Sequence, residues 1–202
     1  MTGMVRKALL IAAGFAVVAS VASAGVPDPR FSTIDPVAVG TNSGAATAQV
    51  AGTPGYDVIV RDVSNAPLAG VTVTLNYSTS AMKVYSTQNA GTTVNCPAKS
   101  ISRVTNGSGQ VTFGPRTGKY NNANTVEVSA NGVVLGNVKG RSTDIDGLGG
   151  QTSLGDLSLF AAVYGAVNQE TDFDVSGGVT GLGDFSIFAA EYAGLILTYC
   201  AP

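Results

Sequence analysis

The chain has 202 residues, with 11 Lys and Arg against 13 Asp and Glu, a formal net charge of −2, and no histidine. A negative total with scattered basic residues lacks the basic footprint of a nucleic-acid-binding protein. The absence of histidine removes the commonest general base and metal ligand near neutral pH, which argues against catalysis.

Residues 1–24 have the pattern of a secretory signal peptide. Two basic residues at positions 6 and 7 precede an apolar run over residues 8–21, and Ala-Ser-Ala at 22–24 provides an A-x-A cleavage site. A membrane anchor is the alternative, but this run has 14 residues, whereas a spanning helix needs about 20. We therefore expect a secreted, extracellular protein, either free or attached to the cell surface.

The next part of the chain has the pattern of a β protein. Residues 25–48 are rich in Pro, Gly, Ser and Thr, which predicts an extended lead-in. Residues 49–140 contain short runs of β-branched and aromatic residues with period two, separated by turn signals such as Asn131-Gly132. The expected strands are Tyr56–Val60, Val71–Leu75, Met82–Tyr85, Gln110–Phe113, Thr125–Val128 and Val133–Leu135. This spacing predicts a mainly β fold with a β-sandwich over 49–140.

Three stretches of this region carry a family resemblance. They are VIVRDVSNAPLAGVTVTLNYS, RVTNGSGQVTFGPRTG and VEVSANGVVLG. Together they resemble the immunoglobulin-like modules of bacterial surface proteins. The resemblance implies an immunoglobulin-like β-sandwich that acts as a spacer or adhesive module and has no catalytic residues.

The chain has two cysteines, Cys96 and Cys200. An even count in an exported protein favours a disulfide. Two free thiols or an intermolecular link remain the alternatives, because the geometry of a disulfide is not readable from sequence.

An enzyme is the competing class of function. No serine lies in a G-x-S-x-G nucleophile elbow. Asp57 and Asp62 flank a strand and are candidates for a pair of catalytic carboxylates, but a strand edge of a sandwich offers no evident pocket. We therefore expect no catalysis, because the sequence has no base, nucleophile or cofactor motif.

The last 61 residues differ from the rest in charge and carry an internal repeat. Residues 25–141 have nine Lys and Arg against five Asp and Glu, whereas residues 142–202 have eight acids and no Lys or Arg. This uncompensated charge opposes compaction unless a cation is bound. Residues 144–164 and 172–192 are identical at 13 of 21 aligned positions, which marks a duplicated supersecondary unit.

Each copy begins with a calcium-loop pattern. Asp at positions one and three, a small polar residue at five, Gly at six and a carbonyl at seven supply oxygens that suit Ca²⁺. The candidate ligands are Asp144, Asp146 and the Gly150 carbonyl in the first copy, and Asp172, Asp174, Ser176 and the Gly178 carbonyl in the second. Leu148 occupies position five of the first copy and has no side-chain oxygen. We therefore expect two calcium sites, of which the second is the stronger.

The closing ligands are Asp156 and Asp184, at position thirteen instead of the usual twelve. Both loops are longer than usual by the same one residue, so the additional residue is a regular feature of the repeat. The residues that follow each closing aspartate have helical periodicity, with apolar residues on one stripe. The alternative is that Asp156 and Asp184 only favour a helix N-terminus, and that the loop aspartates are surface turn residues.

Two calcium loops, each followed by a helix, resemble a type I dockerin. The resemblance covers residues 143 to about 197 and makes 142–202 a small α-helical dockerin-like domain. It implies docking to a protein partner, a cohesin-like module or a cell-surface component, through helix surfaces near Ser153, Leu154, Gly181 and Leu182. The alternative function is a self-assembling structural subunit of an extracellular layer or fibre.

Overall fold

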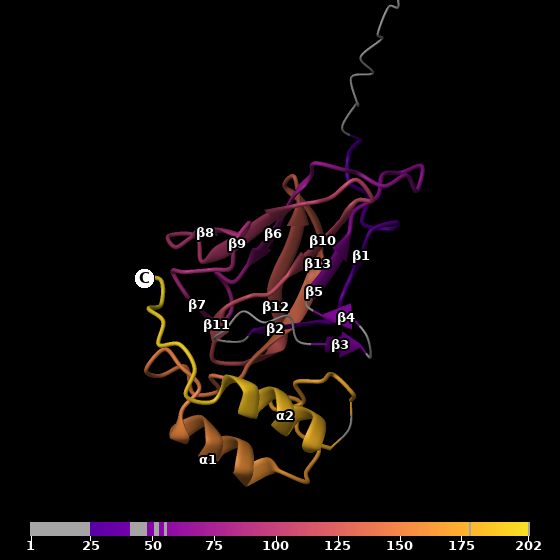
Figure 1. Cartoon of the computed structure of the whole chain (residues 1–202). Coiled ribbons are helices and arrows are strands. Elements are labelled where there is room, and N and C mark those ends of the chain that lie inside the picture. The colour runs from indigo at the N-terminus through magenta and orange to yellow at the C-terminus, as the bar shows by residue number, and fades with distance from the viewer. Residues whose placement is uncertain (1–24, 41–47, 51–52, 55, 178, 202) are drawn as a thin grey trace, which may run out of the picture.

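The computed structural model describes residues 25–40, 48–50, 53–54, 56–177 and 179–201. The expected signal peptide and Gly178 lie outside these ranges. Over the described residues the fold is mainly β, with two short helices below the sheets (Figure 1). Within the described residues, no helix has the length and apolar character needed to cross a membrane.

The strands and helices follow in this order: β1 Thr33–Ile34, β2 Val37–Gly40, β3 Ala48–Val50, β4 Thr53–Pro54, β5 Tyr56–Ile59, β6 Thr72–Asn76, β7 Lys83–Val84, β8 Thr93–Asn95, β9 Ser100–Val104, β10 Gln110–Phe113, β11 Thr117–Gly118, β12 Asn121–Ala130, β13 Val133–Ser142, α1 Leu154–Val163 and α2 Leu182–Glu191.

A six-stranded sheet and a three-stranded sheet contribute to one apolar core. The larger sheet has the order β2-β13-β12-β6-β9-β8, and the smaller has the order β1-β5-β10. Alternate residues of several strands point into the core, as Tyr56 and Val58 do from β5 and Val73 and Leu75 from β6. This alternation is what the period-two pattern predicted.

The β12–β13 hairpin has the turn that its sequence predicted. Asn131 and Gly132 connect the two strands and both have positive φ, 45° and 82°. Asn and Gly adopt this left-handed region at low cost, which suits a two-residue hairpin turn. The end of β13, the second strand of this hairpin, leads directly into the first repeated loop.

Two strands form within the segment expected to be an extended lead-in. β1 pairs with β5, and β2 pairs in parallel with the second half of β13. All four residues of β2 are buried. Val37 and Val39 belong to a second core cluster, which they share with the helical region.

The second core joins the two helices to the sheets. Phe160 of α1 and Phe188 of α2 stack with ring centroids 5.1 Å apart, and Phe160 also stacks on Phe173 at 6.0 Å. The apolar stripe of each helix is buried only in its middle, because Leu154 and Leu182 at the helix starts remain 70% and 76% exposed. The helices therefore keep an apolar outer surface.

The C-terminal segment returns to the β region after α2. Thr198, Tyr199 and Cys200 run beside Ser86, Tyr85 and Val84, with the Ser86 N–H donating to the Thr198 carbonyl at 2.8 Å and the Cys200 N–H to the Val84 carbonyl at 2.8 Å. A disulfide joins Cys96 to Cys200. The end of the repeated region is thus covalently attached to the sheets.

Candidate metal centres

The structure brings the predicted aspartates together as two triads. In each triad one oxygen per carboxylate lies within 4.8 Å of the others. The first triad is Asp144, Asp146 and Asp156, and the second is Asp172, Asp174 and Asp184. In both, the first and last members are buried and the middle one is partly exposed. The duplicated sequence has therefore produced a duplicated arrangement of carboxylates.

The carboxylate at position thirteen reaches the loop because the helix N-terminus holds it there. Asp156 accepts the Ser153 N–H at 2.7 Å with one oxygen and the Asp146 N–H at 2.9 Å with the other. Asp184 repeats the pattern in the second copy, with the Gly181 N–H at 2.9 Å and the Asp174 N–H at 3.1 Å. The additional loop residue is thus absorbed at the N-cap, and the helix-capping role coexists with membership of the triad.

Glycine at position six shapes both loops. Gly149 and Gly177 have φ of 73° and 70°, in the left-handed region where a side chain is costly. This sharp turn lets the chain bring positions one, three and thirteen to one place.

The two copies interlock through matching hydrogen bonds. The Gly165 N–H after α1 donates to the Thr180 carbonyl before α2 at 2.9 Å, and the Ala193 N–H after α2 donates to the Thr152 carbonyl before α1 at 3.0 Å. These four positions are related in pairs by the 28-residue repeat. Each loop is therefore held in place by the end of the other copy's helix.

Buried threonines support the loops. Thr152 and Thr180 lie where the sequence predicts helix caps, but their pairing with the threonines before the first aspartates is not predicted from it. Thr152 donates to Thr143 at 3.0 Å, and Thr171 and Thr180 share a hydrogen bond of 2.6 Å. All four are almost fully buried. Threonine occupies both positions in each copy, and Thr143 and Thr171 directly precede the first aspartates. This repetition is the sequence signal for their role in supporting the loops.

Asp144 is a fully buried carboxylate with one oxygen that lacks a partner. Its Oδ2 accepts hydrogen bonds from the hydroxyls of Tyr85, at 2.6 Å, and Tyr199. Its Oδ1 has no hydrogen-bond partner among the described residues. Burial raises the pKa of Asp144 to about 6, against the effect of the tyrosine hydrogen bonds. A carboxylate that is buried, unpartnered on one oxygen and close to two others is stabilised in its charged form by a bound cation.

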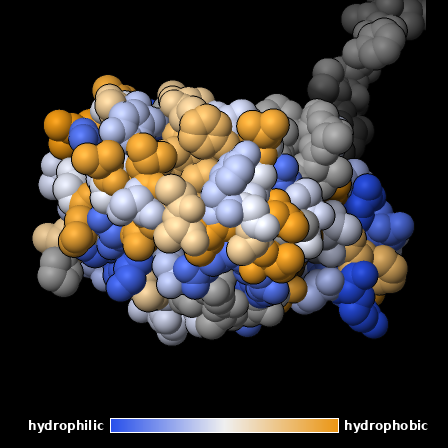
Figure 2. All heavy atoms as spheres, turned by 90° about the horizontal axis from the view of Figure 1, so that it is seen from below, coloured by the Kyte–Doolittle hydropathy of each residue, from blue (hydrophilic) through white to orange (hydrophobic). Residues whose placement is uncertain are grey.

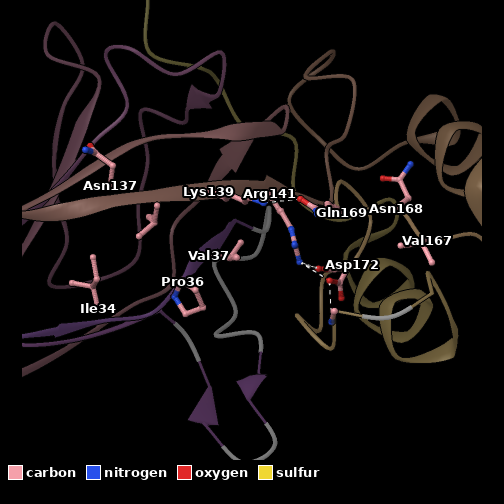
Figure 3. A pocket seen from close by; sticks show the side chains of 12 residues that line it. Ile34, Pro36, Val37, Asn137, Lys139, Arg141, Val167, Asn168, Gln169 and Asp172 are labelled. Carbon is pink, nitrogen blue, oxygen red and sulfur yellow. Dashed lines mark hydrogen bonds and ion pairs between the residues drawn. The ribbon is translucent and has the colours of Figure 1, made fainter.

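Asp172 occupies the equivalent place in the second copy but has different neighbours. It accepts the Ser176 N–H at 3.0 Å and the Gly177 N–H at 3.2 Å, one on each oxygen. Its Oδ2 also forms a buried ion pair of 3.2 Å with Nη1 of Arg141, which donates to the Asp172 carbonyl as well (Figure 3). The second triad therefore contains a protein cation.

The remaining predicted ligands have mixed positions. The Gly150 carbonyl accepts the Leu197 N–H at 2.8 Å, which leaves one lone pair for an ion. Ser176 is exposed and donates its N–H to Asp174 at 3.0 Å. Leu148, at the same position of the first copy, is 63% exposed and donates its N–H to Asp146 at 2.7 Å. Position five thus contributes to both loops through its backbone.

The chain matches no model of a known protein family, no curated protein and no solved structure.

The chemistry of the triads follows from their donors. Carboxylate and carbonyl oxygens without nitrogen or sulfur suit hard cations such as Ca²⁺, which accepts six to eight oxygens from flexible loops.

Proposed function

We propose that this is a secreted, non-catalytic calcium-binding protein. In this proposal residues 142–202 form a dockerin-like unit that docks to a protein partner, and residues 49–140 form an immunoglobulin-like β-sandwich that acts as a spacer or adhesive module. The observation that carries the proposal is the pair of triads on duplicated loop–helix units, with the unpartnered Oδ1 of buried Asp144 in the first.

Two sets of residues would hold the ions. Asp144, Asp146 and Asp156, with the Gly150 carbonyl, would hold the first, and Asp172, Asp174 and Asp184, with the Gly178 carbonyl, the second. Bound Ca²⁺ neutralises acidic side chains that otherwise repel one another, and so it contributes directly to the folding of the unit. The interlocked copies would transmit this stabilisation from one loop to the other.

The outer surface of the helices supports docking. A groove of about 430 Å³ between them is lined by Leu157, Phe160, Ala161, Tyr164, Leu182 and Phe185. Figure 2 shows the end of the molecule where the helices lie, and hydrophobic atoms gather there between hydrophilic ones. Leu154 and Leu182, which the dockerin resemblance places at the partner surface, are among the most exposed apolar residues in the described part of the chain. A partner that buries them would be a cohesin-like module or a cell-surface component.

We expect Ca²⁺ to bind the mature protein and to raise its melting temperature. An ion at a concentration of 100 Kd stabilises a protein by about 2.7 kcal/mol, which corresponds to roughly 5 to 10 °C for a chain of this size. Calorimetric titration and thermal unfolding with and without chelator measure both effects. Asp146→Asn should weaken one site at least about tenfold through loss of a charged ligand.

Glu127→Gln is the matched control for that experiment, because it removes one negative charge from β12 without touching either triad. It should leave the calorimetric isotherm unchanged. A wild-type protein that takes up no Ca²⁺, and melts at one temperature in both buffers, would contradict the proposal.

Docking is expected to depend on both calcium and the helix surface. A panel of immobilised, purified cohesin modules, probed in Ca²⁺ and in chelator, should capture the protein only in Ca²⁺. Leu154→Glu with Leu182→Glu should lower the affinity at least about a hundredfold, because two exposed anchors are replaced by charges. Val104→Glu, at an exposed apolar site on β9 (58% exposed), should have no effect. Self-association in light scattering, without capture by any module, would favour the structural subunit.

A further inference from the structure

We propose that Arg141 is the resident counter-cation of the second triad, and that the two loops therefore bind Ca²⁺ unequally, the first more tightly than the second. This inference rests on the proposed cation binding and assigns a different role to each copy. The second loop holds its folded form through Arg141, and a metal ion enters it only by displacing the guanidinium.

The two triads differ at their first aspartate. Asp144 of the first has two neutral hydroxyl donors on one oxygen and no partner on the other. No lysine or arginine of the described part of the chain forms an ion pair with the first triad. Asp172 of the second has a partner on each oxygen, one of them the charged Arg141. Lys83 lies at the first loop, but it donates to the Gly147 carbonyl and forms no ion pair with a triad carboxylate. The copies therefore share carboxylate geometry and differ in whether a cation pairs directly with a carboxylate.

The Arg141 side chain is placed for this role by the fold. Arg141 is the next-to-last residue of β13 and lies three residues before the first repeat. Only 6% of its side chain and 4% of the Asp172 side chain are exposed. A buried ion pair is strongly coupled, because removal of either charge leaves the other without solvent or partner. A divalent ion beside Asp172 would lie close to the guanidinium and would be repelled by it.

The structure also offers a place for the displaced guanidinium. Arg141, Lys139 and Gln169 lie on the wall of a cavity of about 500 Å³ between β13 and the second loop (Figure 3). The Arg141 Nε has no hydrogen-bond partner among the described residues, so the guanidinium is only partly satisfied where it lies. Rotation into the cavity would free Asp172 without unfolding the strand.

This order of affinities is the reverse of the one that ligand types alone predict. The sequence favoured the second loop because Ser176 replaces Leu148 at position five. Both side chains are exposed, and only Ser176 has a hydroxyl, which interacts with Asp174 of its triad. A charge at contact distance from Asp172 outweighs an optional hydroxyl ligand.

A calorimetric experiment isolates the second loop. Asp146→Asn weakens the first site, and the affinity of the other is then compared between Asp146→Asn and Asp146→Asn with Arg141→Met. We expect the Arg141→Met protein to bind Ca²⁺ at least about tenfold more tightly. Arg141→Lys retains the charge and should stay within about threefold of its Arg141 parent. An unchanged or weaker affinity after Arg141→Met would overturn the inference.

Thermal unfolding provides an independent readout that needs no ion. In chelator, Arg141→Met should melt roughly 5 °C or more below the wild type, because Asp172 loses its cation. Saturating Ca²⁺ should close most of this gap. Equal melting temperatures in chelator would count against Arg141 as counter-cation, whereas a wild type that binds no Ca²⁺ would instead refute the proposed function. Two sites of equal Ca²⁺ affinity, both unchanged by Arg141→Met, would refute this inference and leave the proposed function standing.

Discussion

Replacement of Cys96 and Cys200 by serine is expected to lower the free energy of unfolding by about 4 to 5 kcal/mol. The disulfide closes a loop with a sequence separation of 104 residues. A loop of this length restricts the unfolded chain strongly, and its loss makes the unfolded state more favourable. Urea unfolding followed by circular dichroism measures the change, and the reduced wild type should show the same loss as the double serine protein.

The same replacement should also weaken calcium binding at the first loop. Cys200 holds the segment in which Tyr199 stacks on Tyr85, with ring centroids 4.6 Å apart, and donates to Asp144. Release of this segment removes one of the two hydroxyls that position Asp144. A loss of stability below about 1 kcal/mol, with unaltered calcium affinity, would show that the C-terminal pairing holds without the covalent link.

Phe160→Ala is expected to destabilise the protein by about 3 to 5 kcal/mol. Phe160 is 1% exposed and contacts Phe173 and Phe188, in a cluster that also contains Val37 and Val39 of β2. The cavity would lie where both loop–helix units meet the sheet, so the helices should melt before the β region. Circular dichroism of the helix signal and tyrosine fluorescence should give separate transitions.

Leu159→Ala is the matched control for this prediction. Leu159 precedes Phe160 in α1 but is 45% exposed, and its truncation should cost less than about 1 kcal/mol. Equal losses for the two variants, or a single transition for both probes, would contradict the idea that Phe160 joins the helices to the sheet.

The sequence predicted the local features of the site. The repeat located both loops and both helices, and the aspartates at positions one, three and thirteen are the residues that come together. These features depend on residues within about 13 positions of one another, and loop and capping rules apply at that range. Six strands of the β region were predictable for the same reason, since alternation is visible within each run. The strands β8, β9 and β11 lie outside the runs that the sequence pattern indicated.

The partners that distinguish the two triads were not predictable. Tyr85 and Tyr199 reach Asp144 from 59 and 55 residues away, and the Lys83 ammonium reaches the Gly147 carbonyl, 64 residues along, at 2.7 Å. Arg141 belongs to the basic part of the chain by sequence, although it compensates a charge in the acidic part. The parallel pairing of β2 was hidden because four consecutive buried residues show no alternation.

The parallel pairing of β2 with β13 has a mechanical consequence. The two strands run in the same direction. The N-terminal region enters at the start of β2, whereas the helices follow the end of β13. A pull between the N-terminal region and an anchored helix pair would load the four β2–β13 residue pairs in shear, so that they share the force at once. The link between β2 and the strand that leads to the helix pair would therefore resist tension far better than two strands peeled apart from one end. Its lifetime under load would be set by the rate of strand separation.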